Sequence, residues 1–418
     1  MKVNSYDIII VGGGIAGLYS AYKIQQFSKN AKILVLEKHK KKWFGGRLGN
    51  TIFHDVSVVN GAGVGRKNKD KLLIDLLDDL DVPYAEFNST HQYASTISQP
   101  CDVKQVFNLL KKEYNKNKDR EHITFKKFAK PLLGDKNYQN FLVCAGYTDY
   151  ENEDAYDTLY NYGFEDNYTD WIALKINWKQ LIETLAHTVG LENIRVSSNV
   201  VNIEKIGEAP CEFLVHLENG KTFSCNKVIM ATTITSVKNL VPGAKNKYSI
   251  YQQIHGQPFL RLYAKFSKAS IPLMRTYVPT ITIVPGPLHK IVPYDSNEGI
   301  YMIAYTDNDG ARELKDHMTN SPANRDFFCR LVEISLGMRE NTLKITSMLD
   351  FYWPIGTHYY GPLSDEYSTR NEFIRRAQHP MRGMLVVGEM ISENQGWTEG
   401  ALESVEKVVT KKWVTTDC

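Results

Sequence analysis

The sequence predicts an α/β protein with two domains, and three observations support this prediction. The chain has 418 residues, more than one ordinary hydrophobic core accommodates. A mostly apolar run, Tyr6–Val11, leads directly into a glycine-rich turn, and a second run, Met384–Val387, does the same near the other end. Such runs are typical of strands buried in a parallel sheet. The long middle of the chain is left to form a second domain.

Composition and charge argue against several classes of protein. The 50 basic and 47 acidic side chains nearly cancel, so nothing favours a nucleic-acid partner. No window approaches the roughly 18 apolar residues that a membrane span needs. The six cysteines lack CxxC spacing and the density of a disulfide scaffold. We therefore expect no membrane span, no bound metal, reduced thiols and a cytoplasmic location, and leave a homodimer open.

The first glycine-rich turn has the pattern GxGxxG, formed by Gly12, Gly14 and Gly17. The first glycine permits the tight turn, the second lets the backbone approach a pyrophosphate, and the third lets the next helix pack closely on the strand. That helix begins at about Ile15 and Ala16. Its free amides favour an anion without any basic side chain, so this turn is predicted to bind a dinucleotide.

An acidic residue follows the second strand at the spacing that this turn requires. The run Lys32–Leu36 ends at Glu37, twenty residues beyond Gly17. A carboxylate there accepts hydrogen bonds from both ribose hydroxyls, which a 2′-phosphate would prevent, so NADP is disfavoured. Lys38 comes next and is included among the expected cofactor contacts.

A third motif makes the cofactor assignment specific. After a basic loop come Gly45, Gly46 and Arg47, and the order of strand, acid, short loop and GGR resembles the flavin monoamine, polyamine and L-amino-acid oxidase superfamily. The resemblance implies FAD, with the arginine near its phosphates as a charge-assisted donor. The segment Asn60–Gly65 resembles the one that runs beside the flavin ring in this family. The contacts expected from that segment are Gly61, Ala62 and Gly63.

The C-terminal part carries the second half of the resemblance. Gly388 and Glu389 follow the last strand, and in the family this pair contacts the ribityl and phosphate part of FAD. Gly396–Ala401 then opens a helix whose N-terminus is expected to point at the pyrimidine carbonyls of the flavin. A positive helix end there would stabilise negative charge on the reduced ring. The contacts expected from this helix are Trp397, Thr398 and Ala401.

The resemblance covers three separate parts of the chain. In the middle, Val200 matches the valine whose backbone meets the adenine in this family. The fold is therefore expected to combine a discontinuous Rossmann-like FAD-binding domain, residues 1–85, 180–240 and 381–418, with a substrate-binding domain. The second domain, residues 86–179 and 241–380, is expected to be α+β with a mixed sheet.

The implied activity is oxidation of an amine to an imine and then an aldehyde, with O2 reduced to H2O2. The substrate nitrogen must be neutral, and the family provides a dry slot between two aromatic rings. Trp397 corresponds to one ring, and we expect Tyr359, with Tyr360 close behind, to supply the other. Thr357 or His358 stands where monoamine oxidases carry the cysteine that holds FAD, so noncovalent FAD is expected.

Two arginines bear on the chemistry. The family usually has a lysine on a substrate-domain strand, bonded through water to the reactive flavin nitrogen, and Arg261 takes that position here. Arginine does not readily give up its proton, so this exchange is not conservative. The alternative is a surface arginine on a strand. Arg66 lies near where amino-acid oxidases bind the substrate carboxylate, and is a candidate substrate contact.

Several alternatives remain open. One is an FAD-dependent desaturase or isomerase of an apolar substrate, another is an L-amino-acid oxidase, and a third is a flavoprotein scaffold that has lost its lysine. The sequence shows no second dinucleotide-binding motif, which argues against an NADPH-driven monooxygenase. The acidic residues Asp149, Glu151 and Asp154 would attract a cationic amine, or belong to a solvated loop.

Overall fold

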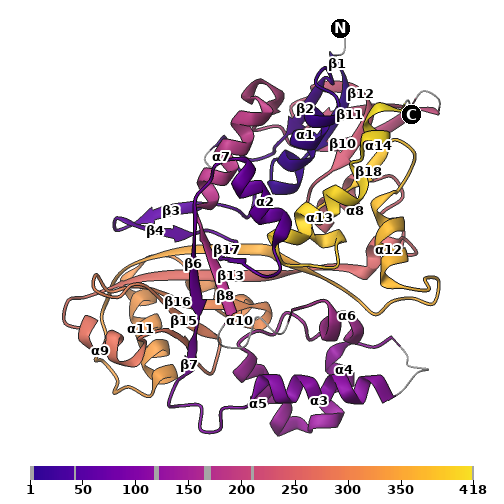
Figure 1. Cartoon of the computed structure of the whole chain (residues 1–418). Helices are drawn as coiled ribbons and strands as arrows, with labels where there is room; N and C mark the ends of the chain where they lie inside the picture. Colours follow the sequence, from indigo (N-terminus) through magenta and orange to yellow (C-terminus); the bar gives the residue numbers. More distant parts are fainter. Residues whose placement is uncertain (1–3, 42–43, 117–121, 164–170, 209–210, 417–418) are drawn as a thin grey trace.

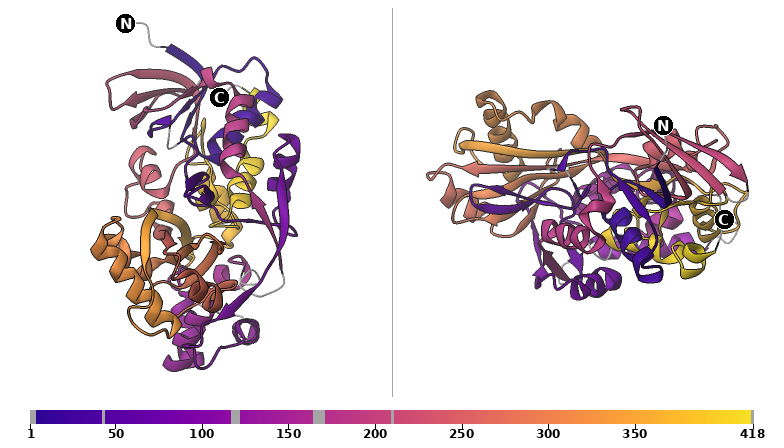
Figure 2. Two further views of the ribbon diagram at one scale, coloured as in Figure 1. Left: turned by 90° about the vertical axis from the view of Figure 1, so that its left-hand side faces the viewer. Right: turned by 90° about the horizontal axis from the view of Figure 1, so that it is seen from above.

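The computed structural model describes residues 4–41, 44–116, 122–163, 171–208 and 211–416. Two large sheets dominate it, one at the end of the molecule that carries the first strand β1 and the last helix α14, the other at the opposite end (Figure 1). Figure 2 shows the same division from two further sides. The predicted mixed α/β class is confirmed.

The first sheet has seven strands in the order β10-β11-β12-β1-β2-β9, with β18 also paired to β12. Pairing is parallel around β1 and antiparallel between β10, β11 and β12. These strands come from three distant parts of the chain. They are β1 (Asn4–Val11), β2 (Ile33–Leu36), β9 (Ile194–Arg195), β10 (Val200–Glu208), β11 (Cys211–Leu217), β12 (Thr222–Met230) and β18 (Met384–Val386).

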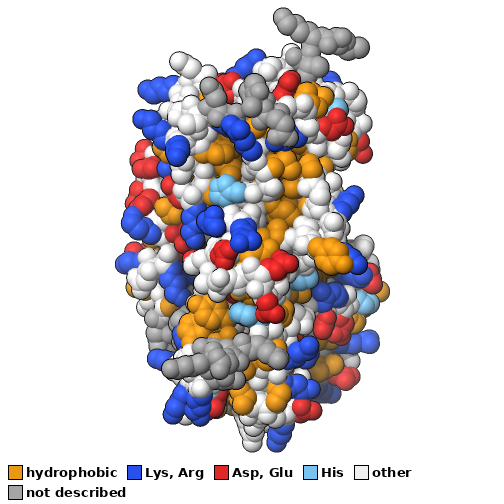
Figure 3. Space-filling view, turned by 90° about the vertical axis from the view of Figure 1, so that its right-hand side faces the viewer, with side chains coloured by type: hydrophobic (Ala, Val, Ile, Leu, Met, Phe, Trp, Pro, Cys, Tyr) orange, Lys and Arg blue, Asp and Glu red, His pale blue; other side chains and the backbone are white. Residues whose placement is uncertain are grey.

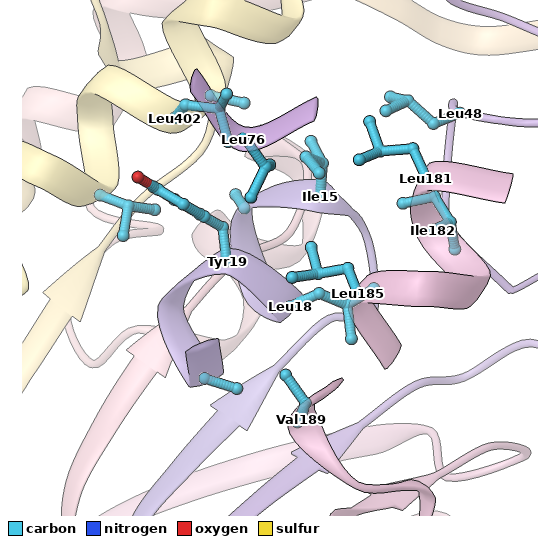
Figure 4. Close-up of a cluster of buried hydrophobic side chains, with 14 of the residues drawn as sticks. Ile15, Leu18, Tyr19, Leu48, Leu76, Leu181, Ile182, Leu185, Val189 and Leu402 are labelled. Atoms are coloured by element: carbon cyan, nitrogen blue, oxygen red, sulfur yellow. The ribbon is translucent and has the colours of Figure 1, made fainter. Parts of the chain in front are cut away.

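Both faces of this sheet are covered, which explains its continuous apolar strands. Ile8 and Ile10 enter one buried cluster, while Ile9 and Val11 enter another, as the alternation of side chains along a strand requires. In the first cluster, helices α1, α2, α7 and α13 interlock through residues such as Leu18 (Figure 4). The helices around this sheet are α1 (Ile15–Phe27), α2 (Lys71–Asp79), α7 (Trp178–Val189), α8 (Ile234–Leu240), α12 (Arg370–Gln378), α13 (Thr398–Val408) and α14 (Lys411–Thr415).

The second sheet has six strands in the order β17-β13-β16-β15-β14-β7. All pairs are antiparallel except β14 with β7, so the sheet is mixed. The strands are β7 (His91–Tyr93), β13 (Ile254–Phe266), β14 (Ile281–Ile283), β15 (Lys290–Asp295), β16 (Ile300–Asp307) and β17 (Ile345–Tyr360). Helices α9 (Ile271–Tyr277), α10 (Asn308–Leu314) and α11 (Pro322–Leu336) lie beside it (Figure 1).

Strand β17 belongs to both halves of the molecule. Its first residue, Ile345, packs in the core beneath the second sheet, while its last residue, Tyr360, packs in a core of the first sheet. Two small sheets lie between the large ones (Figure 1). They are formed by β3 (Asn50–Phe53) with β4 (Val56–Val59), and by β5 (Gly65–Arg66), β8 (Trp171–Ile176) and β6 (Tyr84–Ser89).

Four helices form a separate unit below the second sheet in Figure 1. They are α3 (Val103–Lys116), α4 (Phe125–Leu133), α5 (Asp135–Ala145) and α6 (Ala155–Tyr160). Phe125, Phe141 and Tyr150 form the aromatic centre of their core. The chain between α5 and α6 returns to the second sheet, where Asp307 accepts hydrogen bonds from Thr148. This contact fixes one wall of the site described below.

Three expectations from the sequence concern surface charge, membrane-spanning helices and the state of the cysteines. Basic and acidic side chains are interspersed on the face shown in Figure 3, in keeping with the small net charge. Among the described residues, no helix is both long enough and apolar enough to cross a membrane. Cys101, Cys144, Cys225 and Cys329 are free, but Cys211 is disulfide-bonded, so the expectation of reduced thiols fails there.

Candidate active site

A cavity of about 1700 Å³ lies between the two large sheets. Its first end is bordered by the glycine turn after β1, its middle by the segment Gly61–Gly63, and its far end by strands β13, β15 and β16. Nearly all of the predicted cofactor contacts line it. These are Gly12, Gly14, Ile15, Ala16, Glu37, Lys38, Gly45, Gly46, Arg47, Gly61, Ala62, Gly63, Val200, Gly388, Glu389, Trp397, Thr398 and Ala401.

The glycine turn has the close approaches that its pattern predicts. Gly12 has a φ of +112°, and a Cβ atom there would lie 2.2 Å from the Ala231 carbonyl oxygen. Gly17 does not line the cavity; its place is under the turn, where a Cβ atom would lie 1.9 Å from the Gly12 oxygen. Gly17 therefore has a packing role and is not a cofactor contact, contrary to expectation. Gly14 differs, because a Cβ atom there would meet nothing closer than 3.9 Å and would fill cavity space.

Backbone amides fix the carboxylate of Glu37 at the cavity wall. Glu37 Oε2 accepts a hydrogen bond from Gly13 N at 2.8 Å, and Oε1 accepts one from His39 N at 2.7 Å. The side chain is buried and borders the cavity. A carboxylate oxygen can accept more than one hydrogen bond, so the group retains acceptor capacity toward the cavity.

Glu389 is the centre of a buried polar network. Its Oε1 accepts hydrogen bonds from Arg47 Nη1, at 2.7 Å, and from His358 Nδ1, while its Oε2 accepts from Gly396 N at 2.9 Å. His358 Nε2 accepts from Ile234 N at 3.2 Å, so this imidazole carries its proton on Nδ1. Burial opposes ionisation of Glu389, but His358 and Arg47 hold its pKa well below the usual range.

Replacing Glu389 by glutamine should lower the free energy of unfolding by about 3 kcal/mol at neutral pH, because it breaks a buried charge network. The folded-state pKa is depressed, so this stabilisation is present above the unfolded pKa of about 4.3 and is lost as the pH falls below it. Denaturant unfolding at several pH values measures the difference. Glu393→Gln, which breaks a partly exposed pair with Lys407, is the matched control and should cost less than about 1 kcal/mol. Equal losses at pH 7 and pH 3 would contradict the assignment.

Trp397 lines the cavity at the start of α13, and Arg66 lies behind it. The Arg66 guanidinium carbon is 3.8 Å from the centre of the indole ring, while Nε and Nη2 bond to Asp70 Oδ1 at 2.8 and 2.7 Å. Arg66 is 3% exposed and does not line the cavity. The expectation that Arg66 binds substrate is therefore corrected, because its guanidinium bonds to Asp70 and packs on Trp397. Arg66 supports the indole ring on the side away from the cavity.

Tyr359 and Tyr360 do not line the cavity, contrary to expectation. Tyr360 is buried in the core of the first sheet, where its hydroxyl donates to the Ser392 oxygen at 3.0 Å. Tyr359 stacks on His255, with ring centres 5.1 Å apart. The reason is the position along β17, because the cavity ends at Thr357 and the strand then enters the core. Tyr352 and Trp353, earlier in the same aromatic stretch, line the cavity instead.

Arg261 lies inside the protein against the segment predicted to run beside the flavin. It is 5% exposed, and a Cβ atom on Gly63 would lie 3.2 Å from its Nη2. Its guanidinium carbon is 4.1 Å from the ring centre of Tyr305, and its Nη1 donates to Met302 Sδ at 3.7 Å. The alternative of a surface arginine is therefore wrong. Burial lowers the pKa of Arg261, but Tyr305 and other tyrosines more than offset this and raise it.

Most residues at the far end of the cavity were missed by sequence reasoning, which singled out only Arg261 and Asp149 there. We call this end the aromatic chamber, and its side chains come from the loops near α5 and α6 and from β13, β15 and β16. They are Tyr147, Asp149, Tyr162, Arg261, Lys290, Tyr294 and Tyr305. No local motif marks the other residues, because segments far apart in the sequence form the chamber. The sequence signals were the strand that carries Arg261 and the acidic cluster at Asp149.

That acidic cluster is not a solvated loop, because all three carboxylates are buried. Asp154 accepts hydrogen bonds from Tyr156 N and Leu363 N, and Glu151 accepts one from the Tyr138 hydroxyl. Asp149 alone of the three lines the cavity, where its Oδ1 accepts a hydrogen bond from the Tyr162 hydroxyl at 2.6 Å. Among the described residues there is no cluster of three metal-binding side chains.

A family model described as flavin containing amine oxidoreductase matches residues 15–409. The chain belongs to this family. It is similar to an uncharacterised protein of Acanthamoeba polyphaga mimivirus, with 21% identity over 491 residues covering 98% of this chain and 94% of the viral protein.

Solved structures of putrescine oxidase share the fold of this family member. The wild-type enzyme bound to putrescine has a TM-score of 0.73 and 13% identity, covering 97% of this chain and 98% of that one. A double mutant has a TM-score of 0.74 and 13% identity, covering 98% and 99%. The chain is thus an amine oxidase-like flavin oxidoreductase.

The cavity fits the flavin cofactor that membership of the family implies. Helices α1 and α13 both begin at its wall without a side-chain cap, at Ile15 and Thr398, so their first amides remain donors for anionic or carbonyl oxygens. A Cβ atom on Gly388 would meet nothing within 4 Å, which leaves room beside the backbone. Thr357 Oγ1 lines the cavity and is buried without a hydrogen-bond partner in the described chain.

Proposed function

We propose that the protein is an FAD-dependent amine oxidase that converts an amine to an imine, which hydrolyses to an aldehyde, with O2 reduced to H2O2. One observation carries the proposal: a continuous cavity joins two uncapped helix N-termini to the buried aromatic chamber. The first part suits a dinucleotide, and the second suits a small organic substrate. FAD is proposed to be noncovalent, because Thr357 offers no thiol at the position expected for the linkage.

Bound FAD would supply the acceptor for the hydride equivalent that leaves the carbon next to the substrate nitrogen. In the proposed complex, Gly14 and the first amides of α1 accommodate the pyrophosphate, and Glu37 accepts from the ribose hydroxyls. Arg47 and Glu389, which are joined by a hydrogen bond, would contact the ribityl and phosphate groups. The start of α13 would donate to the pyrimidine carbonyls and favour negative charge there.

Aromatic side chains elsewhere on the cavity wall would bind and orient the substrate together with the chamber. Trp397 provides one aromatic wall, and the rings of Tyr352 and Trp353 are the candidates on β17 that border the same cavity. Trp353 Nε1 donates to the Asn60 oxygen at 2.8 Å, which fixes its ring against the segment before Gly61. A dry aromatic slot disfavours the ammonium form of the amine, so the substrate loses its proton on entering.

The chamber also bears on the competing functions. A desaturase or isomerase of long apolar chains needs an apolar channel, whereas Arg261, Lys290 and Asp149 place three ionisable groups in this chamber. Burying such groups beside an apolar substrate would leave them without partners at a large free-energy cost. This observation favours a polar substrate.

The test is anaerobic mixing of the flavin-loaded protein with monoamines, diamines, polyamines and L-amino acids while the flavin absorbance is recorded. Bleaching by one class, followed by recovery and peroxide formation in air, is the expected result. A protein that binds FAD but is reduced by none of these compounds would contradict the proposal and favour the scaffold alternative.

A further inference from the structure

Lys290 is a buried lysine that faces the cavity and packs on an aromatic ring. It lies at the start of β15, is 8% exposed and borders the aromatic chamber. Its Nζ lies 3.3 Å from the ring centre of Tyr147. Among the described residues this Nζ makes no hydrogen bond and has no carboxylate oxygen within 4 Å. A buried ammonium group normally has such a partner, so the arrangement indicates a missing ligand.

The charges of the nearest acids, Asp307 and Asp149, partly offset the lowering of the Lys290 pKa by burial, but neither acid forms a hydrogen bond or ion pair with Lys290. Asp307 accepts hydrogen bonds from Thr148 N and Thr148 Oγ1, and Asp149 accepts one from the Tyr162 hydroxyl. Burial raises the pKa of Asp149 to about 7 and that of Asp307 to about 6. Burial lowers the pKa of Lys290 to about 7. The three groups therefore interact through their charges, but Lys290 makes no direct hydrogen bond to either acid.

A second buried cation borders the same chamber. The guanidinium of Arg261 lies 4.1 Å from the ring centre of Tyr305, and Lys290 Nζ lies 5.9 Å from that same centre. Arg261 has no carboxylate partner in the described chain either; its side chain donates to the sulfur of Met302. The two aspartates act on Lys290 from nearby, but two basic side chains flank one tyrosine ring. These basic side chains would attract a substrate with an acidic group.

We propose that the substrate is an amine that also carries a carboxylate, such as an amino acid, and that Lys290 binds this carboxylate with Arg261 beside it. This inference rests on the proposed amine oxidation, and specifies the substrate class of that site. A bound carboxylate would give Lys290 the charged partner that it lacks, in a water-poor setting where such pairs are strong. Arg66 has no part in this subsite, because Asp70 and Trp397 occupy it.

The test compares pairs of compounds that differ only by the carboxylate, namely L-phenylalanine with phenethylamine and L-ornithine with putrescine. Anaerobic titration of the flavin-loaded enzyme gives the rate of flavin reduction at each concentration. We expect the amino acid of at least one pair to reach half-maximal reduction at a concentration about tenfold or more below that of its amine. Preference for the amine in both pairs would overturn the proposal.

Binding of benzoate, a carboxylate that cannot be oxidised, tests the subsite without turnover. Calorimetric titration of the flavin-loaded protein should give a dissociation constant that rises about tenfold or more in Lys290→Met. Lys290→Arg should recover most of the affinity, and Lys268→Met, which removes an exposed lysine outside the cavity, should leave it unchanged. Equal affinity of wild type and Lys290→Met for benzoate would refute the role of Lys290.

The two experiments separate this inference from the proposed function. Benzoate binding that depends on Lys290, in a protein whose flavin no amine or amino acid reduces, would support the anion subsite and contradict the oxidase. Rapid reduction by simple amines with no benzoate binding would support the oxidase and contradict the subsite. Thermal unfolding of each variant shows whether it is folded, and removal of an unpaired buried cation is expected to preserve or raise stability.

Discussion

Gly14→Val should yield a folded protein that no longer binds flavin. A valine Cβ at this position meets no protein atom closer than 3.9 Å, and the local φ of −81° with ψ of −176° suits a β-branched residue. The added methyl groups would instead fill the cavity where the backbone is predicted to approach the pyrophosphate. We expect FAD affinity to fall at least about 100-fold, equivalent to roughly 2.7 kcal/mol. Fluorescence titration of the apoprotein with FAD measures this loss.

Gly12→Ala is the matched comparison for Gly14→Val. Its Cβ would lie 2.2 Å from the Ala231 oxygen at a φ of +112°, so it strains the folded chain itself. This variant should lose stability in thermal unfolding, whereas Gly14→Val should unfold near the temperature of the wild-type apoprotein. Normal flavin content in purified Gly14→Val would show that the pyrophosphate does not lie against this turn.

Arg261→Met should slow anaerobic flavin reduction about 100-fold, the scale of loss when one well-placed electrostatic group is removed from an active site. The guanidinium lies against Gly63, in the segment predicted to run beside the flavin, and is held by Tyr305 and Met302. Methionine keeps most of the side-chain volume and removes the charge. Stopped-flow absorbance with the best substrate gives the rate.

Arg261→Lys is the informative companion, because lysine keeps the charge but loses the planar fork. We expect a smaller loss than in Arg261→Met. The methionine variant should be at least as stable as wild type, since a buried guanidinium without a carboxylate partner costs free energy. If substrate reduces the flavin of Arg261→Met at the wild-type rate, Arg261 does not contribute to flavin reduction.

The part of the site that could be predicted from sequence is the part built by local pattern. The turn from Gly12 to Gly17 and the acid at Glu37 are set by short-range geometry, since Gly12 and Gly17 are required by contacts within the turn or with the neighbouring strand. The GGR loop and the start of α13 are similar cases. Their residues come together at one cavity because parallel strands place their C-terminal ends at the same edge of a sheet.

The substrate end could not be predicted in the same way. Lys290 and Tyr147 are in contact although 143 positions separate them in the sequence, and no periodic pattern in either segment indicates this contact. The choice of Tyr359 failed for a different reason. Pairing of β17 with β13 shifts register between Gln257 and Phe259, so the residue that faces the cavity near the end of the strand cannot be counted from sequence alone.

Strand β17 has a consequence for how the molecule unfolds. Its 16 residues begin in the core beneath the second sheet and end, at Tyr360, in a core of the first. Along the way, His358 bonds to Glu389 and to the amide of Ile234. Neither half can therefore unfold without removing part of β17 from the core of the other. We expect the two halves to unfold as one cooperative unit. A hinge motion that opened the whole cavity would break backbone pairing, so we expect substrate to enter through local loop movement.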